Sequence, residues 1–284
     1  MAAQTEGVAR IPADLAPGDA AALDFDWSGL RVRRIRSADD PRFAVAYEQL
    51  WAEFGERREM EQREVIVSRL AWDPNVPIGG YRYLYEIVVV EQDGEIVALR
   101  DHTAITPASS PSSSLGVLVH LSHVLVAPRR RGQGLAAWLR AFPLQAAREC
   151  AAAGGPGPGT ITLVAEMEPP KRADAATLRR LASYGRAGFV KLDPARVHYA
   201  QPDFRTATAI RAGSVEPVPL DLVLRRVGRE HERRVAGEEV RAIVAALYAM
   251  FAAHVRPEHM APLWALHERL PAPHDAVALV PPVE

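Results

Sequence analysis

The sequence of 284 residues predicts a mixed α/β protein, of the α+β kind, in which helices flank a central β-sheet. Short runs rich in apolar and β-branched residues alternate with segments in which apolar residues recur at helical spacing. Asp93-Gly94 is a hairpin signal between two such runs, so part of the sheet is expected to be antiparallel. Hydrophobic residues make up 48% of the chain, which is enough to bury a core.

The first elements follow from local pattern. Residues 30–35 alternate apolar and basic side chains and predict a short strand. Residues 39–41 predict a helix start, and the charged run 56–64 predicts that this helix continues in solvent. The two strands of the hairpin are expected at residues 83–90 and 96–105.

The middle of the chain predicts strand, helix, strand and helix in that order. The β-branched run 117–126 predicts a third long strand. A helix is expected over residues 134–153, with Pro143 predicting a kink or break because proline cannot donate a backbone hydrogen bond. A further strand is expected at 161–166 and a further helix at 175–187.

The C-terminal part changes from strands to helices. Residues 198–204 and 220–227 predict closing strands, whereas 240–251 and 261–270 carry helical spacing. These patterns predict three parts: a flexible leader at 1–28, a catalytic domain at 29–228 and a C-terminal helical extension at 229–284.

Composition excludes several classes of protein. Lys and Arg total 34 and Asp and Glu total 35, so the net charge of −1 gives no reason to expect nucleic acid or a membrane as a partner. No stretch is apolar for long enough to span a bilayer and we find no signal peptide, so we expect a cytoplasmic protein. The single cysteine, Cys150, is expected to be a small buried side chain. The nine histidines are scattered, and no metal site is predicted.

One segment carries the clearest chemical signal. After the predicted strand the chain reads Val126-Ala127-Pro128-Arg129-Arg130-Arg131-Gly132-Gln133-Gly134-Leu135-Ala136. A basic, glycine-containing turn that opens a helix presents free backbone N–H groups together, and this favours binding of a pyrophosphate. Glycine at 132 and 134 lets the phosphates approach the backbone closely. A strand–turn–helix corner with solvated arginines is the alternative.

The segment resembles the signature of the GNAT superfamily of N-acetyltransferases, Arg/Gln-x-x-Gly-x-Gly/Ala, with Arg131, Gly134 and Ala136 in register. Downstream, Tyr184-Gly185-Arg186-Ala187-Gly188-Phe189 resembles the Tyr-x-x-x-Gly-Phe segment of the same family. The resemblance covers residues 31–227. It implies a GNAT-like mixed central sheet, with the C-terminal helices outside it.

What the resemblance implies about function is specific. It implies an acyl-CoA-dependent N-acetyltransferase in which a neutral primary amine attacks the thioester of acetyl-CoA directly. The pantetheine arm would pair with the third long strand, and the turn would hold the pyrophosphate. The implied cofactor-binding residues are Val124, Leu125, Val126, Arg131, Gly132, Gln133, Gly134, Leu135, Ala136 and Ala137. Tyr184 would protonate the departing thiolate; a tyrosine that only packs at a helix end is the alternative.

The catalytic base is predicted from strand periodicity. His120, Ser122, Val124 and Val126 are expected to share one face of the strand, because side chains alternate with period two. The position of His120 resembles that of a base histidine in arylalkylamine N-acetyltransferases, whereas Ser122 stands where those enzymes carry a second histidine. We therefore expect His120 to accept the ammonium proton, with a core histidine as the alternative.

Other titratable residues receive lesser roles. His123 is expected on the opposite face in a structural role. Glu166 and Glu168 are alternative bases or form salt bridges, and Asp101 and His102 line the substrate entrance or a solvated edge.

The acceptor is expected to be the amine of a small molecule, a peptide or a protein. It would be held by residues 51–80 and 107–114, and a homodimer is left open. A non-catalytic GNAT-like domain that binds acyl-CoA as a sensor, or serves as a docking surface, is the alternative function.

Overall fold

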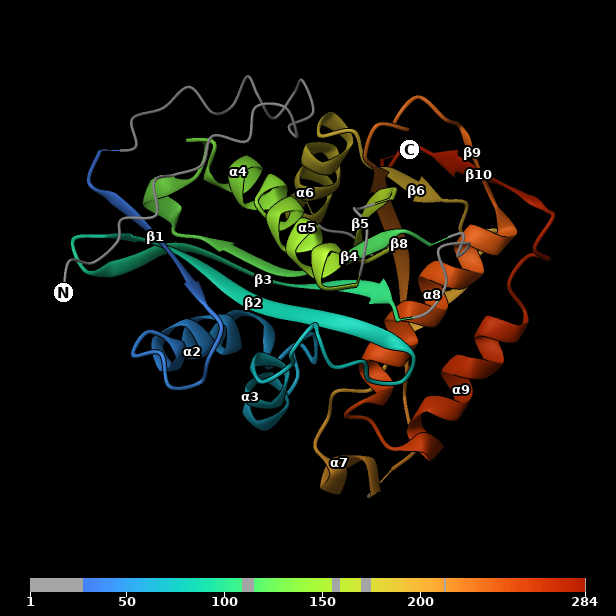
Figure 1. The fold of residues 1–284 in the computed structure, drawn as a ribbon, viewed down its shortest axis with the longest axis horizontal. Helices are drawn as coiled ribbons and strands as arrows, with labels where there is room; N and C mark the ends of the chain where they lie inside the picture. The colour runs from blue at the N-terminus through green and yellow to red at the C-terminus, as the bar shows by residue number, and fades with distance from the viewer. Residues whose placement is uncertain (1–27, 109–114, 155–158, 170–174, 212, 284) are drawn as a thin grey trace.

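The computed structural model describes residues 28–108, 115–154, 159–169, 175–211 and 213–283. The leader predicted at 1–28, except its last residue, lies outside these ranges, as does most of the predicted loop 107–114. Within them the predicted fold class is confirmed, since helices flank a ten-stranded mixed sheet (Figure 1). In spatial order the strands are β1 (Leu30–Ile35), β2 (Tyr81–Gln92), β3 (Glu95–Pro107), β4 (Val117–Val126), β5 (Ile161–Met167), β8 (Val218–Arg226), β6 (Val190–Leu192), β10 (Ala276–Val280) and β9 (Arg234–Ala236), with β7 (Tyr199–Gln201) paired to β8.

The helices cover both faces of the sheet (Figure 1). One face packs against α4 (Leu135–Ala141), α5 (Pro143–Gly154) and α6 (Ala175–Arg186). The other face packs against α2 (Phe43–Phe54), α3 (Arg63–Leu70) and α8 (Gly237–Ala252). The short helix α7 (Ala207–Arg211) and the longer α9 (Pro257–Glu268) lie at the end of the molecule that holds α8.

Several local predictions are confirmed. Asp93 and Gly94 have φ angles of 51° and 82°, the left-handed backbone that a tight hairpin between β2 and β3 requires. The predicted break at Pro143 separates α4 from α5. Gly188, with φ of 81°, follows the end of α6 as its predicted cap.

The predicted continuation of the first helix through residues 56–64 is wrong. Helix α2 ends at Phe54, and the chain turns before α3 begins at Arg63. Residues 56–58 and 63–64 are exposed as expected, but the middle of the segment is not, because Met60 is 1% exposed within the core and Glu61 forms a buried ion pair with Arg69. A straight helix would hold these side chains away from the sheet, so burial prevails over local helical preference.

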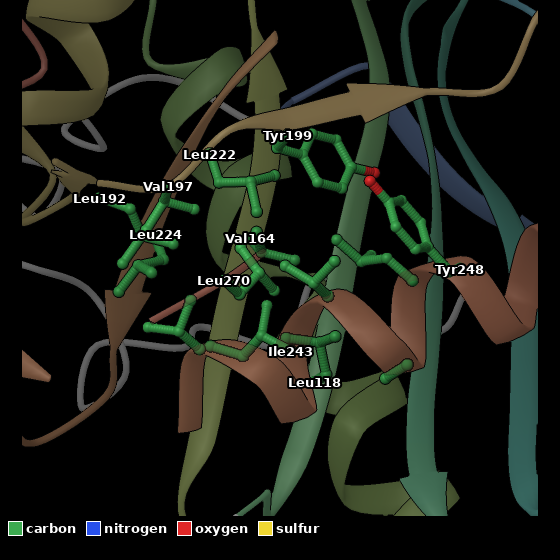
Figure 2. Close-up of a cluster of buried hydrophobic side chains, with 14 of the residues drawn as sticks. Leu118, Val164, Leu192, Val197, Tyr199, Leu222, Leu224, Ile243, Tyr248 and Leu270 are labelled. Carbon is green, nitrogen blue, oxygen red and sulfur yellow. The ribbon is translucent and has the colours of Figure 1, made fainter. Parts of the chain in front are cut away.

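The C-terminal segment contains the two predicted helices, but it is not only helical. Strands β9 and β10 join the same sheet, with β10 pairing to β6 and β9, and the sequence did not predict any of these three. Each is three to five residues long, too short to show a periodicity. Helix α8 is part of the main core, and Figure 2 shows its Ile243 beside Leu118 and Val164 of the central strands and its Tyr248 beside Tyr199 of β7.

Strands β4 and β5 diverge, and this divergence positions the site. They are parallel neighbours, whereas all other adjacent strands of the described sheet are antiparallel. Their pairing runs from Val117↔Ile161 to His120↔Val164 and then stops, although β4 continues to Val126. The edge of β4 that faces β5 is therefore left without a strand partner beyond His120.

A β-bulge lies in β4 at the same place. Arg100 of β3 is opposite Val124, whereas His102, two residues further along β3, is opposite Leu121. Three steps on β4 thus correspond to two steps on β3, so β4 contains one extra residue. A bulge of this kind turns the following side chains to the other face of the sheet.

No helix in the described parts of the chain combines the length and the apolar character needed to cross a membrane.

Candidate active site

The divergence of β4 and β5 opens a cavity of about 220 Å³, here called the acceptor cavity. Strands β4, β5 and β8, the turn after α2, the segment around β7, two residues of α6 and one residue of α8 surround it. Its titratable and polar lining residues are Arg57, Glu59, Glu61, His120, Ser122, His123, Glu166, Glu168, Arg180, Tyr184 and Gln201. The predicted base and the predicted acid, His120 and Tyr184, therefore line one cavity.

His120 forms the centre of a hydrogen-bonded chain. Its Nε2 lies 2.8 Å from Glu166 Oε2, and its Nδ1 lies 3.2 Å from Ser122 Oγ. Tyr199 donates its hydroxyl to the other oxygen of Glu166 at 2.6 Å. Because the carboxylate can only accept, Nε2 carries the proton and Nδ1 is the acceptor that faces Ser122.

The predicted shared face of the strand is wrong beyond Ser122. His120 packs edge-on against Phe251 of α8, with ring centroids 5.8 Å apart. Val124 and Val126 instead pack against the cluster of α4, on the other side of the sheet. The cause is the bulge, because one inserted residue reverses the alternation on which the prediction depended.

His123, for which a structural role was expected, forms a buried ion pair with Asp101. Its Nδ1 lies 3.0 Å from Asp101 Oδ1, its backbone N–H donates to the same oxygen, and its Nε2 donates to the carbonyl of Glu59 at 2.9 Å. Burial lowers the pKa of His123, but the Asp101 charge and hydrogen bonds to both ring nitrogens outweigh burial and raise it to about 9. The bulge also reverses its predicted orientation, since His123 reaches Asp101 and Phe54 on the face that His120 occupies.

The expectation that Asp101 and His102 lie at an entrance or a solvated edge is wrong. Asp101 is 1% exposed and His102 is fully buried. Despite burial, which acts the other way, the His123 charge and hydrogen bonds from His123 and Tyr85 hold the pKa of Asp101 far below its usual range. His102 lies 3.1 Å from Glu86, a buried carboxylate that also pairs with Arg34 and Arg36. Both residues follow a hairpin in sequence, but β1 and β4 cover the two edges of that hairpin.

Tyr184, on α6, is a buried residue of the core that also reaches the acceptor cavity. It is 3% exposed, it lines the acceptor cavity, and its hydroxyl accepts a hydrogen bond from Arg100 Nη2 at 3.0 Å. The guanidinium of Arg140, from α4, lies over its ring at 5.1 Å from the centroid. A phenol whose oxygen already accepts from an arginine keeps its own O–H available as a donor.

A second cavity of about 260 Å³, here called the anion cavity, lies at the predicted glycine turn. Its lining residues are Val126, Arg130, Arg131, Gly132, Gly134, Leu135, Ala136, Ala137, Arg140, Ser183 and Arg186. Four of these are arginines and none is acidic, so the cavity favours an anion. Gly132 and Gly134 have φ angles of 78° and 84°, which other residues adopt at a cost, so glycine is required by the shape of the turn.

Most of the predicted cofactor-binding residues line one of these cavities. Val124 lines the acceptor cavity, and the turn residues with Val126 line the anion cavity. Leu125 and Gln133 do not: the side chain of Leu125 packs with the α2 cluster, and Gln133 accepts a hydrogen bond from Arg130. The backbone of Leu125 belongs to the part of β4 that β5 leaves unpaired, where an added strand would pair.

Sequence reasoning missed the contribution of the C-terminal half to the acceptor cavity. Gln201, Phe204, Leu220 and Phe251 line it alongside the predicted segment 51–80. Phe251 was expected on a helix outside the catalytic domain, and a single sequence contains no signal that brings it to β4. Among the described residues, no group of three or more His, Cys, Asp or Glu side chains could hold a metal ion.

Comparison with known proteins gives matches only among solved structures. No protein-family model matches the chain. No curated protein matches it either. A GNAT family acetyltransferase from Elizabethkingia anophelis with acetyl-CoA bound aligns at 12% identity and a TM-score of 0.38, over 70% of this chain and 99% of that chain. A probable acetyltransferase from Staphylococcus epidermidis aligns at 11% identity and a TM-score of 0.40, over 69% and 98%. An acetyltransferase of the GNAT family from Streptococcus pneumoniae aligns at 15% identity and a TM-score of 0.33, over 70% and 99%.

Two of these structural neighbours are described as GNAT family acetyltransferases and the third as a probable acetyltransferase. Because these three alignments are at 15% identity or less and at TM-scores of 0.40 or less, the function of this chain has to be judged from its own site. The GNAT signature residues Arg131, Gly134 and Ala136 all line the anion cavity. Tyr184, from the second GNAT-like segment, lines the acceptor cavity.

Proposed function

We propose that this protein is an acyl-CoA-dependent N-acetyltransferase that transfers an acetyl group from acetyl-CoA to a primary amine. The observation that supports it most is the unpaired edge of β4, which runs from the acceptor cavity at Val124 to the anion cavity at Val126. A cofactor with an extended amide-containing arm and a pyrophosphate fits such an edge, because the arm can pair as an added strand.

The anion cavity would bind the pyrophosphate of CoA. Backbone N–H groups of the turn from Gly132 to Gly134 would cradle the phosphates, and the lining arginines would supply positive charge. Arg129 is not part of this set, because it pairs with Glu95 at 2.5 Å outside the cavity. The thioester would then lie further back along β4, between His120 and Tyr184.

The reaction needs one proton acceptor and one proton donor. The amine nitrogen attacks the thioester carbon, a C–N bond forms, and the C–S bond breaks with its electron pair on sulfur. The acceptor nitrogen of His120 faces Ser122, so the amine proton would pass to Ser122 Oγ while the Ser122 proton passes to Nδ1. Glu166 would hold the resulting imidazolium, and Tyr184 would protonate the thiolate.

The acceptor cavity favours a cationic amine. Glu61, Glu166 and Glu168 have partners in Arg69, His120 and Arg180 respectively, and Glu59 has no side-chain partner among the described residues. Burial, together with the nearby Glu168 charge, raises the pKa of Glu59. A cationic ligand would stabilise the ionised form of such a carboxylate. An acceptor with an ammonium group is therefore the expected class.

Release of the free CoA thiol tests the proposal. Acetyl-CoA is mixed with arylalkylamines, amino sugars and a lysine-containing peptide in turn, and thiol release is followed with a chromogenic disulfide. We expect release to depend on at least one amine. A protein that binds acetyl-CoA by calorimetry but releases no thiol with any amine would be a sensor, and the enzyme proposal would be wrong.

The cofactor site is tested separately with two variants of one residue. Gly134→Ala and Gly134→Glu impose the same backbone strain, because the φ of 84° disfavours any side chain, and only the second adds a negative charge. We expect Gly134→Glu to bind acetyl-CoA more weakly than Gly134→Ala by roughly tenfold or more. Equal affinity of the two variants would contradict the assignment of the anion cavity.

A further inference from the structure

Arg100 is a buried cation without a charge partner. It lies in the middle of β3, opposite Val124, and is 1% exposed. No ion pair in the described parts of the chain includes it, and its Nε and Nη1 atoms have no hydrogen-bond partner. Its one side-chain hydrogen bond runs from Nη2 to the hydroxyl of Tyr184, 84 residues away.

Such an arrangement is costly for stability. A buried guanidinium has five N–H donors and loses its hydration, so most buried arginines pair with a carboxylate. The same sheet contains an example, since the buried Glu86 is shared by Arg34 and Arg36. A neutral phenol oxygen is a weak partner for a buried cation. A negatively charged one is a strong partner.

We propose that Arg100 is a positioning residue that prepares Tyr184 to protonate the departing thiolate. This inference rests on the proposed acyl transfer. By donating to the phenol oxygen, Arg100 occupies an acceptor position of that oxygen and leaves the O–H directed elsewhere, toward the acceptor cavity that Tyr184 lines. Arg100 does not itself line that cavity, so it acts on the thiolate only through Tyr184.

The charge balance of the step explains why the cation lacks a carboxylate. When the C–S bond breaks, the electron pair stays on sulfur, the Tyr184 proton moves to sulfur, and a phenolate remains. That phenolate is 3.0 Å from Arg100 Nη2, so its charge is paired at the moment it forms. Solvent then returns a proton to the phenolate. A permanent carboxylate beside Arg100 would neutralise the cation and remove this effect.

A purely structural role predicts different behaviour. The hydrogen bond also ties α6 to β3, and its loss could loosen the cleft. Loosening would lower the free energy of unfolding and weaken acetyl-CoA binding. Loosening would lower kcat by the same factor at every pH, because it does not change which proton is transferred.

The test compares Arg100→Met, which removes the charge, with Arg100→Lys, which keeps it. We expect Arg100→Met to lower kcat roughly tenfold with little change in the KM for acetyl-CoA. We also expect the alkaline limb of its kcat profile to move to higher pH, because the phenolate has lost the cation that donates to its oxygen and keeps only Arg140 over its ring. Arg100→Lys should keep the limb near its wild-type position and recover part of kcat.

Two reference measurements make the outcome decisive. In the Tyr184→Phe background, Arg100→Met should cause no further loss of kcat, and the alkaline limb should be absent from both proteins. Tyrosinate absorbance, with the Tyr184→Phe spectrum subtracted, should develop at higher pH in Arg100→Met than in the wild type. This signal needs no turnover, so it tests the coupling of Arg100 and Tyr184 even where no amine is acetylated.

The inference would be overturned if Arg100→Met kept the wild-type kcat and profile. It would equally be overturned if kcat fell in parallel with the free energy of unfolding and the limb stayed in place. If wild-type turnover were absent while the tyrosinate signal shifted as expected, the coupling would stand and the proposed transferase function would be wrong.

Discussion

The ion pair between His123 and Asp101 predicts how stability depends on pH. Both side chains are buried, and the pair ties the bulge of β4 to the middle of β3. Asp101→Asn is nearly isosteric and removes only the negative charge. Because burial alone lowers the pKa of a histidine, His123 should be neutral in this variant.

The direction of the effect follows from the shifted pKa values. The pKa of His123 is raised from 6.5 to about 9, so its stabilisation is fully present below pH 6.5 and is lost as the pH rises toward 9. The pKa of Asp101 is lowered, so its stabilisation is present above its unfolded value of 3.8 and is lost only at lower pH. Between these limits the pair is intact.

The magnitude follows from the size of the shift. Each pKa unit corresponds to about 1.36 kcal/mol, so the shift of His123 amounts at most to on the order of 3 kcal/mol. Removing one member of a buried pair typically destabilises a protein by about 3–5 kcal/mol. We therefore expect Asp101→Asn to be several kcal/mol less stable than the wild type at pH 6.5.

Urea unfolding followed by tryptophan fluorescence measures the difference. The free energy of unfolding of wild type and Asp101→Asn is compared at pH 6.5 and pH 9. Groups outside the pair titrate equally in both proteins, so their contributions cancel in the difference between the two free energies of unfolding. The difference should shrink by up to on the order of 3 kcal/mol at the higher pH. A difference that is the same at both pH values would refute a charged His123.

Two further predictions concern the proposed chemistry. Tyr184→Phe should lower kcat by roughly tenfold or more with CoA affinity little changed. Because this variant leaves Arg100 with one more unpaired N–H, its free energy of unfolding is measured in parallel. Full activity, with chemistry shown to be rate-limiting, would exclude Tyr184 as the proton donor. His120→Ala should lower kcat by about 10²-fold and remove the acidic limb of the pH–rate profile. Ser122→Ala should lower kcat similarly if the proton passes through the hydroxyl, whereas a wild-type profile in His120→Ala would leave Glu166 or solvent as the base.

The sequence was sufficient for features that depend on neighbouring residues. A hairpin at Asp93-Gly94 requires positive φ at two consecutive positions, and few residue pairs tolerate that. The break at Pro143 follows from a missing backbone donor. The glycine turn before α4 was also readable, because positive φ at Gly132 and Gly134 is a local backbone requirement; its role as an anion site stays a prediction.

The candidate residues were named correctly in part, but their geometry was not predictable. His120, Val124 and Tyr184 do line one cavity, yet the period-two argument that placed His120 and Val124 on one face of the strand was wrong. Strand periodicity assumes an unbroken ladder, and a bulge is visible only when the register with β3 is known. For the same reason, the proximity of His123 and Asp101 could not be read from their spacing.

The sequence by itself therefore determined the class of fold, the main strands and helices, and the glycine-containing turn before α4, because these depend on backbone preferences and side-chain patterns within a few residues. Tertiary structure decided the divergence of β4 and β5, the bulge that orients His120 and His123, and the contact of Arg100 with Tyr184. It also decided that Phe251 and strands β9 and β10 belong to the same core. These features arise from contacts between residues tens to hundreds of positions apart, where burial and pairing prevail over local preference.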